Sequence, residues 1–127
     1  MGETIIEKII RHNTGKAVKP GDIVTVNVDR VMIHDIFIPF VADKFEEMGF
    51  TKLHDPDKVV LIYDHLVPAS QQDDTRHFRN GDAFAEKYGL THVHRSDGIC
   101  HQLMTEAGYV KPGDIAFGTD SHTTTYG

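Results

Sequence analysis

Two unbroken apolar runs constrain the fold of this chain more than any other feature of its sequence. Residues 59–63 read Val-Val-Leu-Ile-Tyr, and residues 114–118 carry Ile-Ala-Phe ahead of a glycine. Such runs are typical of strands in a parallel sheet with helices on both faces, because neither face of such a strand meets water. We therefore predict buried parallel strands at 59–63 and at 114–118.

Helical and strand patterns fill the sequence around these two runs. Thr4 and Glu7 form a capping-box sequence ahead of apolar residues with helical spacing, and Gly15 is a plausible end for that helix. Apolar–polar alternation at 23–29 predicts a half-buried strand. The remaining predictions are helices at 35–48, 70–88 and 98–107 and a short strand at 90–94. Because strands alternate with helices, we predict an α/β fold with a mainly parallel sheet flanked by helices, forming a single domain over residues 1–127.

The composition is that of a soluble globular protein without affinity for nucleic acid. The chain has 127 residues, of which 39% are hydrophobic and 25% charged, and its formal net charge is −6. An acidic chain without a basic run has little attraction for nucleic acid or for an anionic membrane surface. No apolar run approaches the length needed to cross a bilayer, and Glu3 and Glu7 interrupt the stretch that a signal peptide would need. We therefore expect a cytoplasmic protein.

Histidine and aspartate residues follow the predicted strands at the places where a ligand site is expected. In open parallel sheets, ligands bind beyond the carboxyl ends of the strands. Three segments deliver such side chains: Asp64 and His65; His101; and Asp120, Ser121 and His122. Crossover connections bring strand carboxyl ends to one side of a sheet, so we predict that five of these residues converge on one edge: Asp64, His65, His101, Asp120 and His122.

A carboxylate beside an imidazole has a definite chemical use. It fixes the tautomer of the ring and supports the charged form for proton transfer near neutral pH. The same groups also bind or orient metal ions. Taken singly, each residue has a simpler explanation: Asp64 and Asp120 fit helix caps, and His65 and His101 fit structural histidines. Glycine-rich nucleotide-binding loops and the HExxH zinc motif are absent from the sequence.

Cys100 is the sole cysteine of the chain. One thiol forms no internal disulfide and cannot by itself build a multi-thiolate metal centre. Its simplest explanation is a small, buried thiol in the core. We therefore predict no metal ligand in this chain.

An ordered set of short motifs resembles the beginning of proteins of the aconitase family. In chain order the motifs are the helix start at 4–10, Pro-Gly-Asp at 20–22, His-Asp at 34–35, Asp-His at 64–65, Gly-Ile-Cys-His-Gln at 98–102, Pro-Gly-Asp at 112–114 and Gly-Thr-Asp-Ser-His-Thr-Thr-Thr-Tyr-Gly at 118–127. The last string is similar to the signature of the 3-isopropylmalate dehydratase and homoaconitase branch. The resemblance covers the whole chain but only about the first third of a typical large subunit, so we expect a truncated amino-terminal part of a larger protein.

This resemblance implies a hydro-lyase that uses a 4Fe–4S cluster to dehydrate a branched 2- or 3-hydroxy di- or tricarboxylic acid, such as 3-isopropylmalate in leucine biosynthesis. By this resemblance, Asp64 and His65 protonate the departing hydroxyl. The resemblance places three further residues around the iron-bound oxygen: His101, Asp120 and His122. It also implies that Ser121 contacts the substrate. The family's three cysteine ligands are absent from this chain, and a small-subunit partner is implied to carry the rest of the substrate site.

Several alternatives follow from the same residues. Bulky Phe37 stands where relatives often carry threonine, which keeps homoaconitase and a dimethylmalate-type dehydratase open as alternatives. A mononuclear metal-binding domain built on the five site residues, and a non-catalytic domain of the same fold, are alternatives from other classes. We expect the isolated chain to be inactive, since Cys100 is its only thiol. We also expect it to self-associate through apolar faces that a neighbouring domain would cover.

Overall fold

The computed structural model describes residues 2–127 and contains a four-stranded sheet in which every pair of neighbouring strands is parallel. The sheet order is β3-β2-β1-β4. Its strands are β1 (Arg30–His34), β2 (Val59–Ile62), β3 (His92–His94) and β4 (Ala116–Gly118). The helices are α1 (Ile5–Thr14), α2 (Ile38–Glu47), α3 (Asp74–Tyr88) and α4 (Cys100–Glu106), with short 3-10 turns η1 (Pro56–Lys58) and η2 (Thr123–Tyr126). The prediction of an α/β fold is confirmed.

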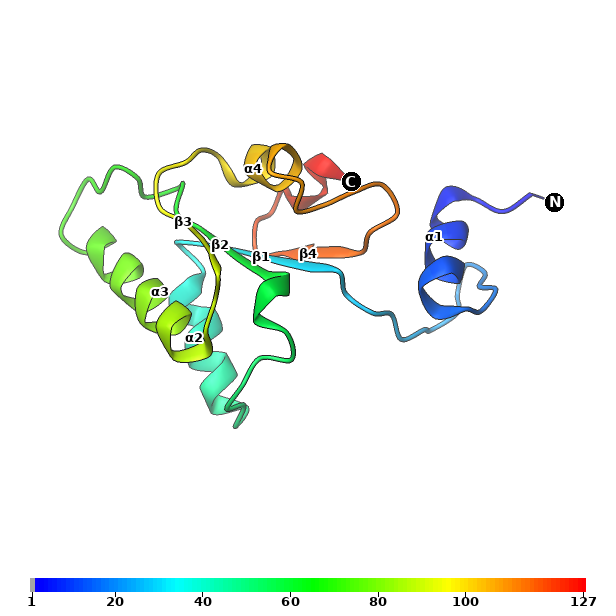
Figure 1. Cartoon of the computed structure of the whole chain (residues 1–127), viewed down its shortest axis with the longest axis horizontal. Helices are drawn as coiled ribbons and strands as arrows, with labels where there is room; N and C mark the ends of the chain where they lie inside the picture. The colour runs from blue at the N-terminus through cyan, green and yellow to red at the C-terminus, as the bar shows by residue number, and fades with distance from the viewer. Residues whose placement is uncertain (1) are drawn as a thin grey trace.

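Helices cover both faces of the sheet. Figure 1 shows α2 and α3 side by side on one face, with α4 and the 3-10 turn η2 on the other. Along β1 and β2, Ile33 and Leu61 enter the core beneath α2 and α3, whereas Met32 and Val60 enter the core beneath α4. Successive side chains of a strand point to opposite faces, so each central strand contributes to two separate cores.

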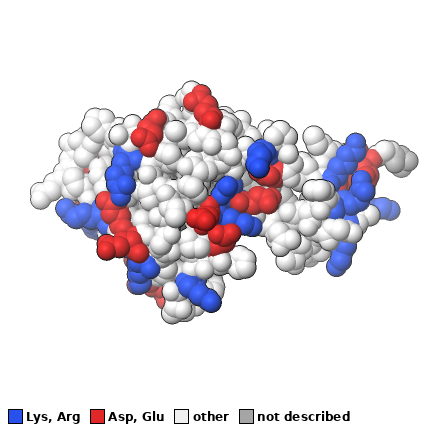
Figure 2. All heavy atoms as spheres, in the orientation of Figure 1, with Lys and Arg blue, Asp and Glu red and all other residues white. Residues whose placement is uncertain are grey.

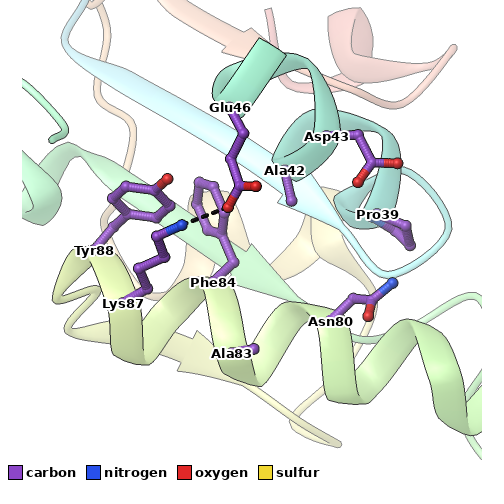
Figure 3. A pocket seen from close by; sticks show the side chains of 9 residues that line it. All are labelled: Pro39, Ala42, Asp43, Glu46, Asn80, Ala83, Phe84, Lys87 and Tyr88. Carbon is purple, nitrogen blue, oxygen red and sulfur yellow. Dashed lines mark hydrogen bonds and ion pairs between the residues drawn. The ribbon is translucent and has the colours of Figure 1, made fainter. Parts of the chain in front are cut away.

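The seam between α2 and α3 is aromatic inside and charged at its surface. The rings of Phe84 and Tyr88 have centroids 4.6 Å apart in the core. Above them, Lys87 of α3 pairs with Glu46 of α2, beside a shallow hollow that Figure 3 shows. None of the predicted site residues lines this hollow. We interpret it as the packing seam of the two helices.

Helix α1 begins and ends as predicted but stands apart from the sheet (Figure 1). The backbone N–H of Glu7 donates to Thr4 Oγ1 at 3.2 Å, and the N–H of Thr4 donates to Glu7 Oε2 at 2.6 Å, which completes the capping box. Gly15 ends the helix in the left-handed conformation, at φ 72°. No residue of α1 is buried. Two hydrogen bonds of 2.8 Å between the Asn13 side chain and the Asn27 backbone tie the helix to the connecting segment.

The strand predicted at 23–29 is wrong. This segment is an extended connector that has no ladder partner within the described chain, and Ile23 is completely exposed, at 101%. Alternation shows only that a segment could place apolar groups on one side. On that side Val24 is 37% exposed and Val26 and Val28 are only partly buried. Only the end of the segment reaches the sheet, where Asp29 exchanges hydrogen bonds of 2.8 Å with Ile115.

The central strand β1 was not predicted, and β4 is less buried than predicted. Strand β1 lies directly after the connector and pairs with β2 on one side and β4 on the other. Strand β4 is one of the two edge strands of the sheet, and Phe117 in its middle is 56% exposed. The other predicted elements, at 35–48, 59–63, 70–88, 90–94 and 98–107, are confirmed with shifts at their ends.

Charged side chains of both signs mix on the molecular face shown in Figure 2. Acidic and basic groups lie beside one another over the body of the sheet, so this face presents no broad field of a single sign. In residues 2–127, no helix combines the length and the apolar character that crossing a membrane requires.

Candidate functional site

The carboxyl ends of β1, β2 and β4 meet at one edge of the sheet, and candidate side chains follow each of them. His34 closes β1, Asp64 and His65 follow β2, and Asp120 follows β4. His101 enters from the first turn of α4. Because all three strands run in the same direction, the loops after them share one edge, which is where ligands bind in open α/β sheets.

Asp120 is the centre of this edge. Its Oδ2 lies 3.2 Å from His65 Nε2, and its Oδ1 lies 3.0 Å from His101 Nε2. His34 Nε2 is 3.9 Å from Oδ2. The backbone N–H of His122 donates to Oδ1 at 2.6 Å, so a local turn holds the carboxylate in place. We call Asp64, His65, His101 and Asp120, together with His34 and Asp35, the Asp120 cluster.

Asp64 ties His65 to the start of α4. Its Oδ1 lies 2.6 Å from His65 Nδ1, and its Oδ2 accepts the backbone N–H of Cys100 at 2.7 Å. His65 therefore faces a carboxylate at each ring nitrogen, Asp64 at Nδ1 and Asp120 at Nε2. Only a protonated imidazole can donate from both nitrogens, so this geometry favours the imidazolium.

The pKa of His65 is displaced in the direction that this geometry requires. Burial, the largest single influence, lowers the pKa, but the hydrogen bond and charge of Asp64 and the charges of Asp35 and Asp120 raise it, and the net shift is upward from 6.5. The pKa of Asp120 is lowered: burial raises it, while the His122 N–H and the neighbouring imidazoles of His101, His34 and His65 outweigh that effect. Both shifts favour the charged forms, an imidazolium at His65 and a carboxylate at Asp120.

His34 and Asp35 belong to the site although they were not predicted as site residues. The Asp35 side chain is completely buried and accepts backbone N–H groups from Ile36 at 3.0 Å, His65 at 3.3 Å and Leu66 at 2.8 Å. The His34 ring stacks on the His65 ring with centroids 4.2 Å apart. The signal for both residues was present in their position at the carboxyl end of β1, and it was missed because that strand was not predicted.

His122 and Ser121 lie at the rim rather than inside the cluster. The His122 side chain is 79% exposed, and its Nδ1 is 3.7 Å from Asp120 Oδ1. Ser121 is also exposed, and its Oγ lies 2.9 Å from the same Nδ1. The structure therefore links Asp64 to His65, and both His65 and His101 to Asp120, and it leaves the other two predicted residues at the rim.

Cys100 lies beside the cluster as a buried thiol. Its side chain is fully covered, and it packs with Met32, Val60 and Met104 in the core beneath α4. Burial and the nearby carboxylate of Asp64 raise the pKa of the thiol to about 12. It is therefore a neutral packing group rather than a thiolate ligand.

Three side chains of the cluster have metal-ligand chemistry but are already engaged. Ligand atoms of His34, Asp35 and His65 lie within 4.8 Å of one another. Asp35, however, accepts three backbone N–H groups, and His65 Nδ1 is bonded to Asp64. In the described part of the chain, the Nδ1 atoms of His34 and His101 are buried without a hydrogen-bond partner. We interpret the group as a hydrogen-bonded cluster with two imidazole nitrogens left free, rather than as a cation site.

Comparison with known proteins identifies the family. The sequence model for the Aconitase family (aconitate hydratase) matches residues 5–127. The chain belongs to the aconitase family. This membership confirms the resemblance drawn from the ordered motifs.

The chain is also similar to curated members of this family. It is 41% identical over 128 residues to "3-isopropylmalate dehydratase large subunit 1" of Methanopyrus kandleri, and 42% identical over 130 residues to the 3-isopropylmalate dehydratase large subunit of Moorella thermoacetica. Both alignments cover 100% of this chain and 31% of the relative. The corresponding protein of Methanoregula boonei is 39% identical, with 30% of its length covered. The chain thus spans just under a third of the length of the relatives that it matches.

Proposed function

We propose that this chain supplies part of the active site of a hydro-lyase of the 3-isopropylmalate dehydratase type. The observation that carries the proposal is His65, held by Asp64 at one ring nitrogen and by Asp120 at the other. Elimination of water requires a proton for the departing hydroxyl, and an imidazolium is well suited to supply it near neutral pH. The names of the most similar relatives support the same reaction class.

In this proposal the proton comes from His65 Nε2. The Nδ1 atom keeps its 2.6 Å bond to Asp64, which orients the ring and balances its charge. The Cys100 N–H holds Asp64 in turn. A substrate hydroxyl that replaces Asp120 as the partner of Nε2 receives the proton as its C–O bond breaks, while a base outside these 127 residues removes the proton from the neighbouring carbon and the double bond forms. Asp120 and His101 then orient the oxygen that leaves, and Ser121 and His122 contact the substrate from the rim.

A 4Fe–4S cluster with three thiolate ligands does not fit the residues of this chain alone. The sequence has one cysteine, and Cys100 is buried with a raised pKa. We therefore assign any cluster ligands to residues outside these 127. Asp64, His65, His101 and Asp120 receive roles in binding, orientation and proton transfer that do not require them to hold iron.

The substrate class and the partner are further parts of the proposal. Phe37 packs edge-on against the His34 ring, with centroids 5.2 Å apart, and remains partly exposed at the edge of the site. An apolar ring there suits an apolar branch on the substrate better than a third carboxylate, which favours 3-isopropylmalate over the homoaconitase alternative. The relatives are named as large subunits, which supports a small-subunit partner.

The test uses the complete protein that contains this segment, together with its small subunit. We expect it to convert 3-isopropylmalate into an unsaturated acid, which is followed by near-ultraviolet absorbance. His54→Gln, at an exposed histidine outside the site, is the matched control for His65→Gln. Turnover of homocitrate-type acids alone would refute the substrate assignment. Absence of dehydration with any branched hydroxy acid would refute the hydro-lyase assignment.

A further inference from the structure

A second group of titratable side chains lies on strand β3 and shares no residue with the Asp120 cluster. It consists of His92 and His94 of β3, Asp97 after the strand, and Tyr109 after α4. His92 pairs in register with Val60, and His94 pairs with Ile62, both of which enter the core beneath α4. The two imidazoles therefore project from the same face of the sheet, against which Tyr109 also packs.

The hydroxyl oxygen of Tyr109 lies between the two imidazoles. It is 2.7 Å from His94 Nε2 and 3.4 Å from His92 Nδ1. In a tetrahedral site with metal–nitrogen bonds of about 2.0–2.1 Å, neighbouring donor atoms lie about 3.3 Å apart. The separation from His92 Nδ1 already matches this spacing, whereas the phenol oxygen has to move about 0.6 Å away from His94 Nε2 to share one ion with it.

Asp97 fixes which nitrogen of His94 carries a lone pair. Its Oδ2 lies 2.6 Å from His94 Nδ1, so the Nδ1–H of the neutral ring donates to the carboxylate. The lone pair of Nε2 then points at Tyr109. A carboxylate behind a ligating histidine is the usual arrangement at metal sites, because it orients the ring and raises its basicity.

We propose that His92, His94 and Tyr109 form a binding site for a divalent late transition-metal ion such as Zn²⁺ or Cu²⁺, with Asp97 orienting His94. Two imidazoles among three donors select such ions over Mg²⁺ or Ca²⁺, which prefer oxygen. The guanidinium carbon of Arg30 lies 5.8 Å from the centroid of the Tyr109 ring. All three donor residues are partly exposed, so an ion can reach them from solvent.

The proton balance of binding is defined. The Tyr109 hydroxyl gives up its proton to solvent as its oxygen binds the ion. His92 moves its proton from Nδ1 to Nε2. His94 keeps the proton on its Nδ1 atom, where it stays hydrogen-bonded to Asp97. Binding therefore releases about one proton per ion at neutral pH, as metal binding to protonated ligands must.

The test titrates Zn²⁺ alone into the 127-residue chain by calorimetry, in two buffers of different ionisation enthalpy. We expect one ion to bind, with release of about one proton. His92→Gln and His94→Gln each weaken binding by more than tenfold, and Asp97→Asn weakens it by roughly tenfold, as loss of an orienting partner does. Tyr109→Phe weakens binding and abolishes the proton release. His12→Gln and His54→Gln, at exposed histidines elsewhere, leave the affinity unchanged.

A second measurement uses the unaltered chain, so it does not depend on the variants folding. Substoichiometric Cu²⁺ broadens the ring proton resonances of nearby histidines in NMR spectra, and we expect those of His92 and His94 to broaden first. Broadening centred on His65 and His101, or zinc affinity that survives both His92→Gln and His94→Gln, would overturn the proposal. Either result would leave this group as a set of hydrogen bonds that holds β3 to the segment after α4.

Discussion

Replacement of Asp35 by asparagine tests whether one buried carboxylate organises the candidate site. Its two oxygens accept three backbone N–H groups, and asparagine offers a single oxygen and an amide that points its own hydrogens at a backbone donor. One to two hydrogen bonds are lost and a buried donor is left unpaired, at about 1–3 kcal/mol each. We expect Asp35→Asn to lower the free energy of unfolding by roughly 2–4 kcal/mol.

The assay is urea denaturation, together with an NMR titration of His65. Asp35 Oδ1 lies 3.7 Å from His65 Nδ1, so removal of this negative charge lowers the pKa of His65. Asp74→Asn is the matched control, since Asp74 is also buried and accepts the backbone N–H groups of Ser70 and Gln71. The control should lose comparable stability and leave the His65 titration unchanged.

The pH dependence of the effect has a definite sign. Burial raises the pKa of Asp35, but the neighbouring His34 imidazole and the backbone N–H groups of Leu66, His65 and Ile36 outweigh that effect and lower the pKa below its ordinary value. The stability from this group is therefore present above the unfolded pKa of about 3.9 and is lost as the pH falls through the folded pKa. The difference between the wild-type and Asp35→Asn chains should shrink below about pH 4. A stability loss under about 0.5 kcal/mol at pH 7, or an unchanged His65 titration, would refute the reasoning.

Four further predictions follow from the same structure. The isolated chain should show no hydratase activity after iron–sulfur reconstitution, because Cys100 is its only thiol; activity in a spectrophotometric assay would contradict this. In the complete enzyme, His65→Gln should cut turnover by roughly 10²–10⁴ with little change in KM, and Asp64→Asn should act in the same direction; steady-state kinetics that show a KM effect alone would argue against a general acid. Cys100 should resist thiol reagents in the native chain and react only on unfolding, whereas rapid native labelling would show that it is not buried. The chain should self-associate with rising concentration through exposed apolar groups such as Phe117, and a clean monomer in sedimentation would count against it.

The sequence sufficed for most of the fold and for the centre of the site. Continuous apolar runs marked β2 and, with less burial than predicted, β4. The rule that ligand groups follow the carboxyl ends of parallel strands then placed Asp64, His65 and Asp120 together. His101 was predicted at the same edge because it lies in the sequence between β2 and β4. Its contact with Asp120 confirms that placement.

Strand β1 and the site residues at its end could not be predicted, because they depend on which apolar segment pairs with neighbouring strands. Residues 23–29 and β1 both carry apolar residues, and periodicity alone favoured the first. Only the second lies between two other strands, where its backbone groups are paired on both sides. Missing β1 meant missing His34 and Asp35 after it. The exposure of His122 follows from a turn at Asp120 that no spacing in the sequence indicates.

The position of β4 has a consequence for the order in which the site is assembled. Contacts between β1 and β2 close a short stretch of chain, since Lys58 and Val28 are 30 residues apart, whereas Asp29 and Ile115 are 86 residues apart. Loop-closure entropy grows with the logarithm of that separation, so docking of β4 costs about 1 kcal/mol more than docking of β2. Only three residues of β4 pair with a neighbouring strand, and they pair with β1 alone, so few hydrogen bonds offset this cost.

We therefore expect the edge strand to dock last during folding and to open first in the native state. Asp120 follows this strand, so each opening would part it from His65 and His101 while the central strands stay paired. The carboxylate at the middle of the site is thus delivered by an edge strand whose docking closes a long stretch of chain. Local opening of β4 and proton transfer at His65 are therefore coupled through the side chain of Asp120.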